Sequence, residues 1–168
     1  TRVNGYAAES ERTYFTAPPS KDACAAFAAM IEARRLAFDV IKPGLPCSEL
    51  DAVVNEFLGK EGFLSEDQRL HRTGHGIGLG NHEAPYLAEG SEERLSENMV
   101  ISVEPGIYIK GLGGIRHSDT VLVTQDGHEP LTCFPTCLHS LVIKDWKLKS
   151  RLRGTVLRRK LGLTDQHT

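Results

Sequence analysis

The sequence predicts an α+β domain in which two amphipathic helices precede a set of antiparallel strands. Three observations support this class. Apolar side chains recur at helical spacing in residues 50–58, a second helical stripe occupies residues 21–41, and residues 99–124 read as strands joined by a glycine-rich hairpin turn. With 168 residues, 40% of them hydrophobic, the chain can bury the core of one ordinary domain.

The chain begins with a strand pattern over residues 3–15. Because strand side chains alternate between two faces, Glu9 and Glu11 are expected to project from the same face. Two neighbouring carboxylates need a cation, a metal or a shared proton. The alternative is a solvated face on which Arg2 and Arg12 pair with them.

Two helices should follow. Ser20 is the expected N-cap of a helix over residues 21–41, which Pro43-Gly44 ends. Ser48 is the expected cap of the second helix, with Asp51 favouring the positive end of its dipole. The apolar stripes of both helices predict core, and we assign them no chemistry.

A glycine- and histidine-rich stretch, residues 71–85, carries the strongest functional signal. Histidines stand at 71, 75 and 82, and glycines alternate at 74, 76, 78 and 80. In an extended segment this alternation leaves one face bare, so another backbone or a ligand can approach closely. The stretch does not fit a dinucleotide-binding loop, because Leu79 stands where the third glycine is required.

Three ordered segments resemble motifs of the pita-bread metallopeptidases, which include methionine aminopeptidase, prolidase, aminopeptidase P and the metal-free creatinase branch. Residues 71–85 resemble the histidine motif of that family, residues 97–108 its Glu-Pro-Gly strand, and residues 114–124 its last metal strand. The resemblance implies the pita-bread fold, in which helices back a curved antiparallel sheet and the site lies on the concave face.

The resemblance also implies a domain organisation. The family's domain is longer than this chain, so residues 1–143 are expected to be its C-terminal part, without the N-terminal part. Residues 144–168 form a basic tail with partial helical spacing. A membrane-surface or nucleic-acid arm is one interpretation of the tail, and a solvated terminal helix is the preferred one.

The family holds two divalent ions with two Asp, one His and two Glu. His75 matches the metal-binding His, Glu104 matches the first Glu, and Glu9 stands at the second Asp. The first Asp would precede the chain, and Ser118 stands at the last Glu. Asp119 does not restore that ligand, because successive strand residues point to opposite faces. We therefore expect one Mn, Co or Zn ion, or none, and not two fully occupied metals.

The same resemblance gives roles to residues beside the metals. His71, His82 and Arg116 match substrate-binding positions, and together with Glu11 they are the catalytic candidates. Glu11 and His117 could instead form a proton-transfer and cation-binding site without metal, as in the creatinase branch.

These residues predict a hydrolase of peptide or amide C–N bonds that resembles the Xaa-Pro peptidases, prolidase and aminopeptidase P, with a depleted metal site. One alternative is a metal-independent, creatinase-like hydrolase of a small guanidino or amide compound. Another is a non-catalytic binding module. Fold alone does not choose among the three, because pita-bread proteins serve all of these roles.

Composition bounds the partners. The formal net charge of −2 gives no indication of nucleic acid or an anionic membrane as a partner. No apolar run approaches a bilayer span, no signal-peptide pattern is visible, and the four cysteines form no Cys-x-x-Cys pair. We expect a small peptide or amide substrate, a cytoplasmic location and, from the family resemblance, a possible homodimer.

Two geometric predictions follow. His75 and Glu104 should converge in one concave pocket, with their side chains within about 5 Å, because one ion would hold both at roughly 2.0–2.2 Å. Ser118 should point into the same pocket as Arg116, while His117 and Asp119 point away, because strand side chains alternate.

Overall fold

The computed structural model describes residues 2–63 and 65–143 and has the predicted α+β architecture. Its elements, in chain order, are β1 (Arg2–Val3), β2 (Tyr6–Ala7), β3 (Ser10–Glu11), α1 (Lys21–Val40), α2 (Cys47–Lys60), the 3-10 helix η1 (Glu66–Gln68), β4 (Gly74–Gly76), β5 (Glu83–Leu87), β6 (Val100–Val103), β7 (Gly106–Ile109), β8 (Gly113–Arg116), β9 (Ser118–Val123), β10 (His128–Pro130) and α3 (Leu138–Leu141). The helical tail expected over residues 144–168 lies outside the described residues.

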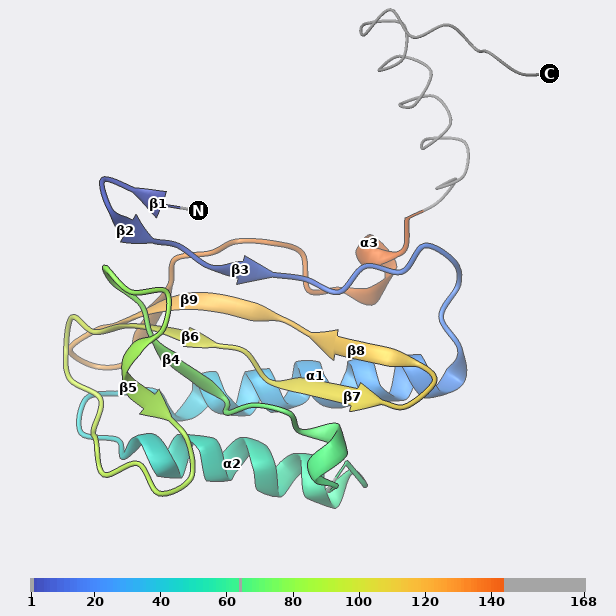
Figure 1. The fold of residues 1–168 in the computed structure, drawn as a ribbon, viewed down its shortest axis with the longest axis horizontal. Helices are drawn as coiled ribbons and strands as arrows, with labels where there is room; N and C mark the ends of the chain where they lie inside the picture. The colour runs from blue at the N-terminus through green and yellow to red at the C-terminus, as the bar shows by residue number, and fades with distance from the viewer. Residues whose placement is uncertain (1, 64, 144–168) are drawn as a thin grey trace, which may run out of the picture.

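The main sheet is antiparallel throughout, with strand order β10-β9-β6-β4-β5 and with β3 added beside β9. Strands β7 and β8 form a two-stranded ladder that extends β6 and β9 (Figure 1). The register is the same on both sides of the break, since Val103 pairs with Asp119 and Gly106 with Arg116. Glu104 therefore falls opposite Ser118.

The two long helices run in opposite directions across one face of the sheet (Figure 1). The side chain of Ser20 caps α1, as predicted, by accepting a hydrogen bond of 3.2 Å from the amide of Ala23. The predicted stripes are confirmed, because Met30, Leu50 and Leu58 are fully buried against the sheet core. This leaves the other face of the sheet free for polar side chains. Within the described residues, no helix is long and apolar enough to cross a membrane.

The prediction of one continuous strand over residues 3–15 is wrong. Asn4 and Gly5 both have positive φ, 51° and 89°, and make a tight turn that pairs Val3 with Tyr6. Asn-Gly is a favoured pair for such hairpin turns, because both positions require positive φ. The strand is thereby divided into a small hairpin and β3.

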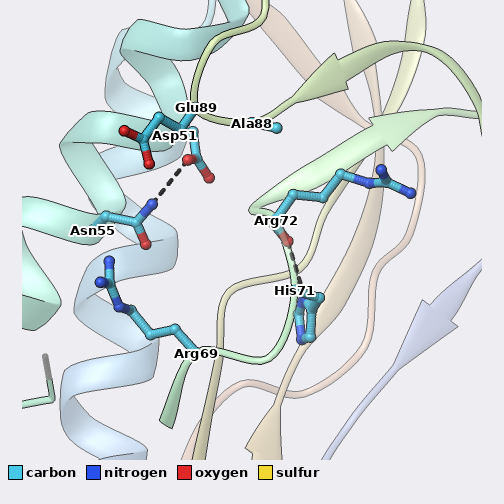
Figure 2. A pocket seen from close by; sticks show the side chains of 7 residues that line it. All are labelled: Asp51, Asn55, Arg69, His71, Arg72, Ala88 and Glu89. Carbon is cyan, nitrogen blue, oxygen red and sulfur yellow. Dashed lines mark hydrogen bonds between the residues drawn. The ribbon is translucent and has the colours of Figure 1, made fainter. Parts of the chain in front are cut away.

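The predicted cap of the second helix is also wrong. Helix α2 begins at Cys47 after Pro46, with no side-chain cap. Asp51 is buried, and its Oδ1 accepts hydrogen bonds from the amide of Thr73 at 3.0 Å and the hydroxyl of Thr73 at 2.6 Å. Its Oδ2 accepts from Asn55 at 2.8 Å (Figure 2). This carboxylate therefore ties α2 to the segment that leads into β4.

Candidate metal centre

The alternating glycines allow β4 to lie close to both of its neighbours. A Cβ at Gly74 would lie 2.0 Å from the carbonyl oxygen of Ser102, and one at Gly76 would lie 2.3 Å from that of Ala84. No side chain fits at either distance. The predicted close approach of another backbone is confirmed, and it brings His75 onto the sheet between β5 and β6.

His75 is held from two sides by its own backbone and by its ring. Its amide donates to Ser102 Oγ at 3.0 Å, and its ring Nδ1 lies 3.0 Å from the carbonyl oxygen of Gly76. Because a carbonyl only accepts, this contact assigns the proton of the neutral ring to Nδ1. A lone pair is then left on Nε2, in a residue that is 1% exposed.

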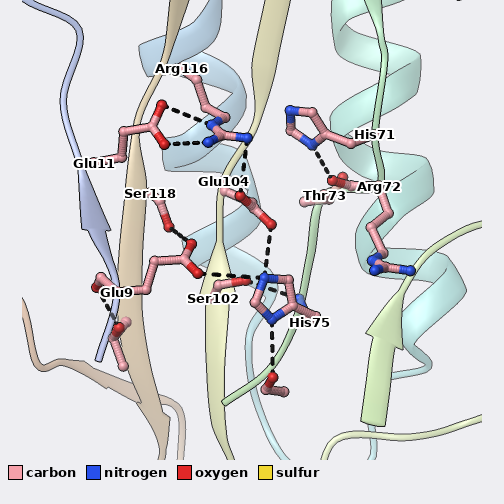
Figure 3. A network of polar contacts seen from close by, with 12 residues as sticks. Glu9, Glu11, His71, Arg72, Thr73, His75, Ser102, Glu104, Arg116 and Ser118 are labelled. Carbon is pink, nitrogen blue, oxygen red and sulfur yellow. Dashed lines mark hydrogen bonds and ion pairs between the residues drawn. The ribbon is translucent and has the colours of Figure 1, made fainter. Parts of the chain in front are cut away.

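Two carboxylates face that lone pair (Figure 3). Nε2 of His75 lies 3.1 Å from Glu104 Oε1 and 3.7 Å from Glu9 Oε2, which confirms the predicted convergence of His75 and Glu104. Nε2 is nevertheless a buried atom without a hydrogen bond of good geometry in the described part of the chain. A lone pair facing anionic oxygens is repulsive unless a proton or a cation lies between them, so the donor set fits a divalent ion.

The side chain of Ser118 also points to this site. Its hydroxyl donates a hydrogen bond of 2.5 Å to Glu9 Oε1, while the other carboxylate oxygen of Glu9 faces His75. The hydroxyl of Thr120 donates to the backbone carbonyl of Glu9 at 2.7 Å. Glu9 is thus fixed by β9 through both its backbone and its side chain.

His117 and Asp119 lie on the opposite face of β9, as predicted. The His117 ring is fully buried and contacts Phe27 of α1 edge-on, with ring centroids 5.3 Å apart. Asp119 accepts from Arg12 at 2.5 Å and from Arg34 at 2.6 Å. His117 is therefore not a proton-transfer group of the pocket, which corrects the metal-free variant that paired it with Glu11.

Arg116 lies at the top of the polar network in Figure 3, beside Glu11 and Glu104. Its Nε donates to Glu11 Oε1 at 2.9 Å and its Nη2 to Glu11 Oε2, so the pair is bidentate. Its Nη1 lies 3.6 Å from Glu104 Oε2. Both oxygens of Glu11 bind this guanidinium group, so Glu11 holds the positive charge of Arg116 beside Glu104. The alternative in which Arg2 and Arg12 pair with Glu9 and Glu11 is wrong. Arg12 pairs with Asp119, and Arg2 donates to the Leu79 carbonyl and to Asn81.

The other two motif histidines make different contacts. His71 has Nδ1 at 2.8 Å from the carbonyl oxygen of Arg72 and Nε2 at 2.9 Å from the hydroxyl of Tyr108. His82 is exposed, and its ring centroid lies 4.2 Å from that of His75. One ligand atom from each of Glu9, His75 and His82 lies within 4.8 Å of the other two.

These side chains border a cavity of about 660 Å³. Its lining residues are Glu9, Glu11, Leu70, His71, Arg72, His75, His82, Ala88, Glu104 and Arg116. All of the site residues predicted from sequence are therefore brought to one pocket. The sequence patterns predict no role for Arg72 or Tyr108, although they lie in residues 71–85 and 97–108. Tyr108 contacts His71, and Arg72 stacks 4.4 Å from the ring centroid of Tyr86.

The electrostatics of the site shift the pKa values of His75 and Glu104 in opposite directions. Burial lowers the pKa of His75, but Glu104, the Gly76 carbonyl and Glu9 outweigh it, so the pKa lies above its usual value. Burial raises the pKa of Glu104, but His75, His71 and Arg116 outweigh it, so that pKa lies below its usual value. The carboxylate of Glu104 is thus charged at neutral pH and available to a cation.

An imidazole lone pair and two carboxylates gathered on an antiparallel sheet are the donor set of a divalent-metal protein. The chain belongs to metallopeptidase family M24, which matches residues 1–125. The resemblance found in the sequence is confirmed, and membership implies the use of a divalent metal.

Relatives and solved structures agree with this assignment. A probable dipeptidase PepE of Mycobacterium tuberculosis is 38% identical over 139 residues, covering 83% of this chain and 36% of its own length. An Xaa-Pro dipeptidase of Pyrococcus furiosus is 39% identical over 129 residues, covering 77% and 36%. The crystal structure of the dipeptidase PepE from Mycobacterium ulcerans superposes with a TM-score of 0.79 at 38% identity, over 85% of this chain and 38% of that one.

An Xaa-Pro dipeptidase from Bacillus anthracis gives a TM-score of 0.78 at 37% identity, over 83% of this chain and 38% of that one. These superpositions confirm the pita-bread fold. The chain spans little more than a third of the length of these relatives.

Proposed function

We propose that this chain carries the metal-binding part of a hydrolase that cleaves the C–N bond of small peptides, as the name Xaa-Pro dipeptidase states for its relatives. The observation that supports it most directly is the buried Nε2 of His75, 3.1 Å from Glu104 and 3.7 Å from Glu9. Residues 1–143 are then the C-terminal part of the catalytic domain.

Glu9, His75 and Glu104 are the residues that would hold the ion, with Mn, Co or Zn as the candidates. A divalent ion supplies a polarised substrate carbonyl and a hydroxide nucleophile at neutral pH. The role of the protein is to keep the donors in place. Ser102 accepts from the backbone amide of His75, the carbonyl of Gly76 accepts from its ring Nδ1, and the hydroxyl of Ser118 fixes Glu9.

Substrate binding falls to the groups around these donors. His71, whose Nε2 accepts from Tyr108, can exchange a proton with a leaving amine, and Arg116 can stabilise negative charge that develops on a substrate oxygen. Glu11 acts through Arg116 by accepting hydrogen bonds from Nε and Nη2, along one edge of its guanidinium group. His82 is exposed beside His75 and can serve as a substrate-side base or as a ligand.

The proposal includes a setting. All four cysteines are free thiols, which supports a reducing, cytoplasmic compartment. A homodimer is the assembly to test by size-exclusion chromatography, because the family resemblance suggested it.

The test is hydrolysis of an Xaa-Pro dipeptide by the full-length protein, first after treatment with a chelator and then with added Mn²⁺, Co²⁺ or Zn²⁺. We expect activity that depends on the ion and that falls at least about 100-fold in His75→Gln and Glu104→Gln. Glu61→Gln, an exposed residue after α2, is the matched control and should retain full activity.

The two alternative functions predict different results. A creatinase-like hydrolase would keep its activity on an amide or guanidino substrate after chelation, a possibility that the close His75–Glu104 pair keeps open. A binding module would hydrolyse nothing with or without metal. Either result would overturn the proposal.

A further inference from the structure

We infer that His82 is the fourth donor of a single-ion centre formed with Glu9, His75 and Glu104, and that this centre prefers Zn²⁺ or Co²⁺ to Mn²⁺ or Mg²⁺. The inference rests on the proposed function and names its metal site more closely. It replaces the substrate-side role that sequence resemblance gave to His82 with a role as a ligand.

The distances from His75 to the two carboxylates fit one ion. For four-coordinate zinc with bonds of roughly 2.0–2.1 Å, neighbouring donor atoms are about 3.3 Å apart. The His75 Nε2 distances to Glu104 and Glu9, 3.1 and 3.7 Å, lie on either side of that value. A donor atom of His82 lies within 4.8 Å of those of Glu9 and His75, and Glu104 joins these three through its contact with His75.

His82 is free to take this place. It makes no hydrogen bond or ion pair with any other described residue, and its only recorded contact there is the ring of His75, 4.2 Å away between centroids. Its side chain is exposed, so it can change rotamer at little cost. His75, in contrast, is fixed by the hydrogen bond from its amide to Ser102 Oγ and by the contact of its ring with the Gly76 carbonyl, and it provides the rigid side of the centre.

Ser118 limits the centre to one ion. Position 118 is where the family has its last metal-binding Glu. In this chain the hydroxyl of Ser118 donates to Glu9 Oε1, so this oxygen of Glu9 is already engaged. The remaining anionic donors, one oxygen of Glu9 and the carboxylate of Glu104, balance the charge of a single divalent ion. A second ion beside it would add two positive charges with no further carboxylate from Ser118 to offset them.

The donor types determine the metal preference. Two imidazole nitrogens and two carboxylate oxygens suit Zn²⁺ and Co²⁺, which accept nitrogen readily in four-coordinate sites. Mg²⁺ and, to a smaller degree, Mn²⁺ prefer a set made of oxygen. The ordinary order of affinities also places Co²⁺ and Zn²⁺ above Mn²⁺ at such a site.

The experiment is a titration of the chelator-treated full-length protein with Co²⁺, followed by calorimetry and by the visible absorption of the ion. We expect one Co²⁺ per chain with the intense absorption of a four-coordinate ion. In His82→Gln the affinity should fall at least about tenfold and the absorption should weaken as water replaces imidazole. His139→Gln, the same change at an exposed histidine of α3, should alter neither.

The outcomes separate this inference from the proposed function. Unchanged affinity and absorption in His82→Gln, together with a loss in His75→Gln, would overturn the role of His82 and leave the proposed metal site intact. Two Co²⁺ per chain would overturn the single-ion centre. Binding that survives in both His82→Gln and His75→Gln would overturn the proposed function as well.

Discussion

Ser118 and Glu9, 109 residues apart in the chain, are joined by a hydrogen bond of 2.5 Å from the serine hydroxyl to the carboxylate. The bond exists because β3 pairs with β9, in a register that places Glu11 opposite Ser118 and directs the alternate side chains to one face. Ser118 stands where the family has a metal-binding Glu. Instead of adding a carboxylate to the site, it orients the carboxylate of Glu9.

Replacing Ser118 with Ala should weaken divalent-metal binding. Without the hydroxyl, Glu9 keeps its backbone anchor but loses the contact that directs Oε2 to His75, and the loss of such orienting contacts typically costs about 10–100-fold in metal affinity. Calorimetry with Zn²⁺ measures the change. Ser140→Ala, at an exposed serine of α3, is the control, and equal affinities for the two variants would show that Ser118 does not position Glu9.

Replacing Asp119 with Asn should destabilise the fold without touching the site. The fully buried carboxylate is shared by Arg12 and Arg34 and also accepts from Thr132 at 2.7 Å. Removing its charge leaves two guanidinium groups without their counter-ion, which costs about 3–5 kcal/mol in buried pairs.

Urea denaturation gives the free energy of unfolding of this variant. Asp39→Asn is the matched control, because Asp39 pairs with Arg35 on the exposed surface of α1. Such surface pairs contribute little to stability. A loss at Asp119 no larger than the loss at Asp39 would contradict the counter-ion role.

Local patterns in the sequence account for much of the fold and the site. The stripe of Leu50, Val54 and Leu58, the cap at Ser20 and the bare face of the alternating glycines depend on residues near one another in the chain, so propensity and periodicity were sufficient. Strand alternation alone placed Ser118 and His117 on opposite faces.

Contacts between distant segments could not be read in this way. By sequence alone Asp51 is expected to interact with the helix dipole, but in the fold it accepts hydrogen bonds from Thr73, 22 residues away in the chain. Arg12 is likewise expected to pair with Glu9, but in the fold it pairs with Asp119. In both cases the burial of the carboxylate decides its partner, and burial depends on the tertiary fold. The turn at Asn4-Gly5 is different, because the Asn-Gly pair is itself a local sequence pattern that favours a hairpin turn.

Replacing Asp51 with Ala should lower both stability and metal affinity. The change removes the acceptor of the buried Thr73 amide, and an unsatisfied buried donor costs about 1–3 kcal/mol. Thr73 lies two residues before His75, so the histidine should also become less well fixed. Thermal unfolding and Zn²⁺ titration measure the two effects, with Asp67→Ala at an exposed position of η1 as control. Reduced stability with unchanged metal affinity would refute the second effect alone.

Replacing His117 with Leu should make the protein as stable or more stable at pH 7, and less sensitive to acid. Both ring nitrogens of this fully buried residue have no hydrogen-bond partner among the described residues, and such groups typically cost about 1–3 kcal/mol each.

Burial, and then Arg12 and Arg34 acting against Asp119, lower the pKa of His117 to about 4. An unfolded histidine takes up its proton at about pH 6.5, whereas the folded one stays neutral down to about pH 4. The free energy of unfolding is therefore unaffected by this group above about pH 6.5 and falls by up to about 3 kcal/mol as the pH drops to about 4. The free energy of unfolding, measured by urea denaturation from pH 7.5 to 4, should therefore decline less steeply in His117→Leu than in the wild type. Parallel pH profiles for the two proteins would show that His117 is not buried as a neutral ring.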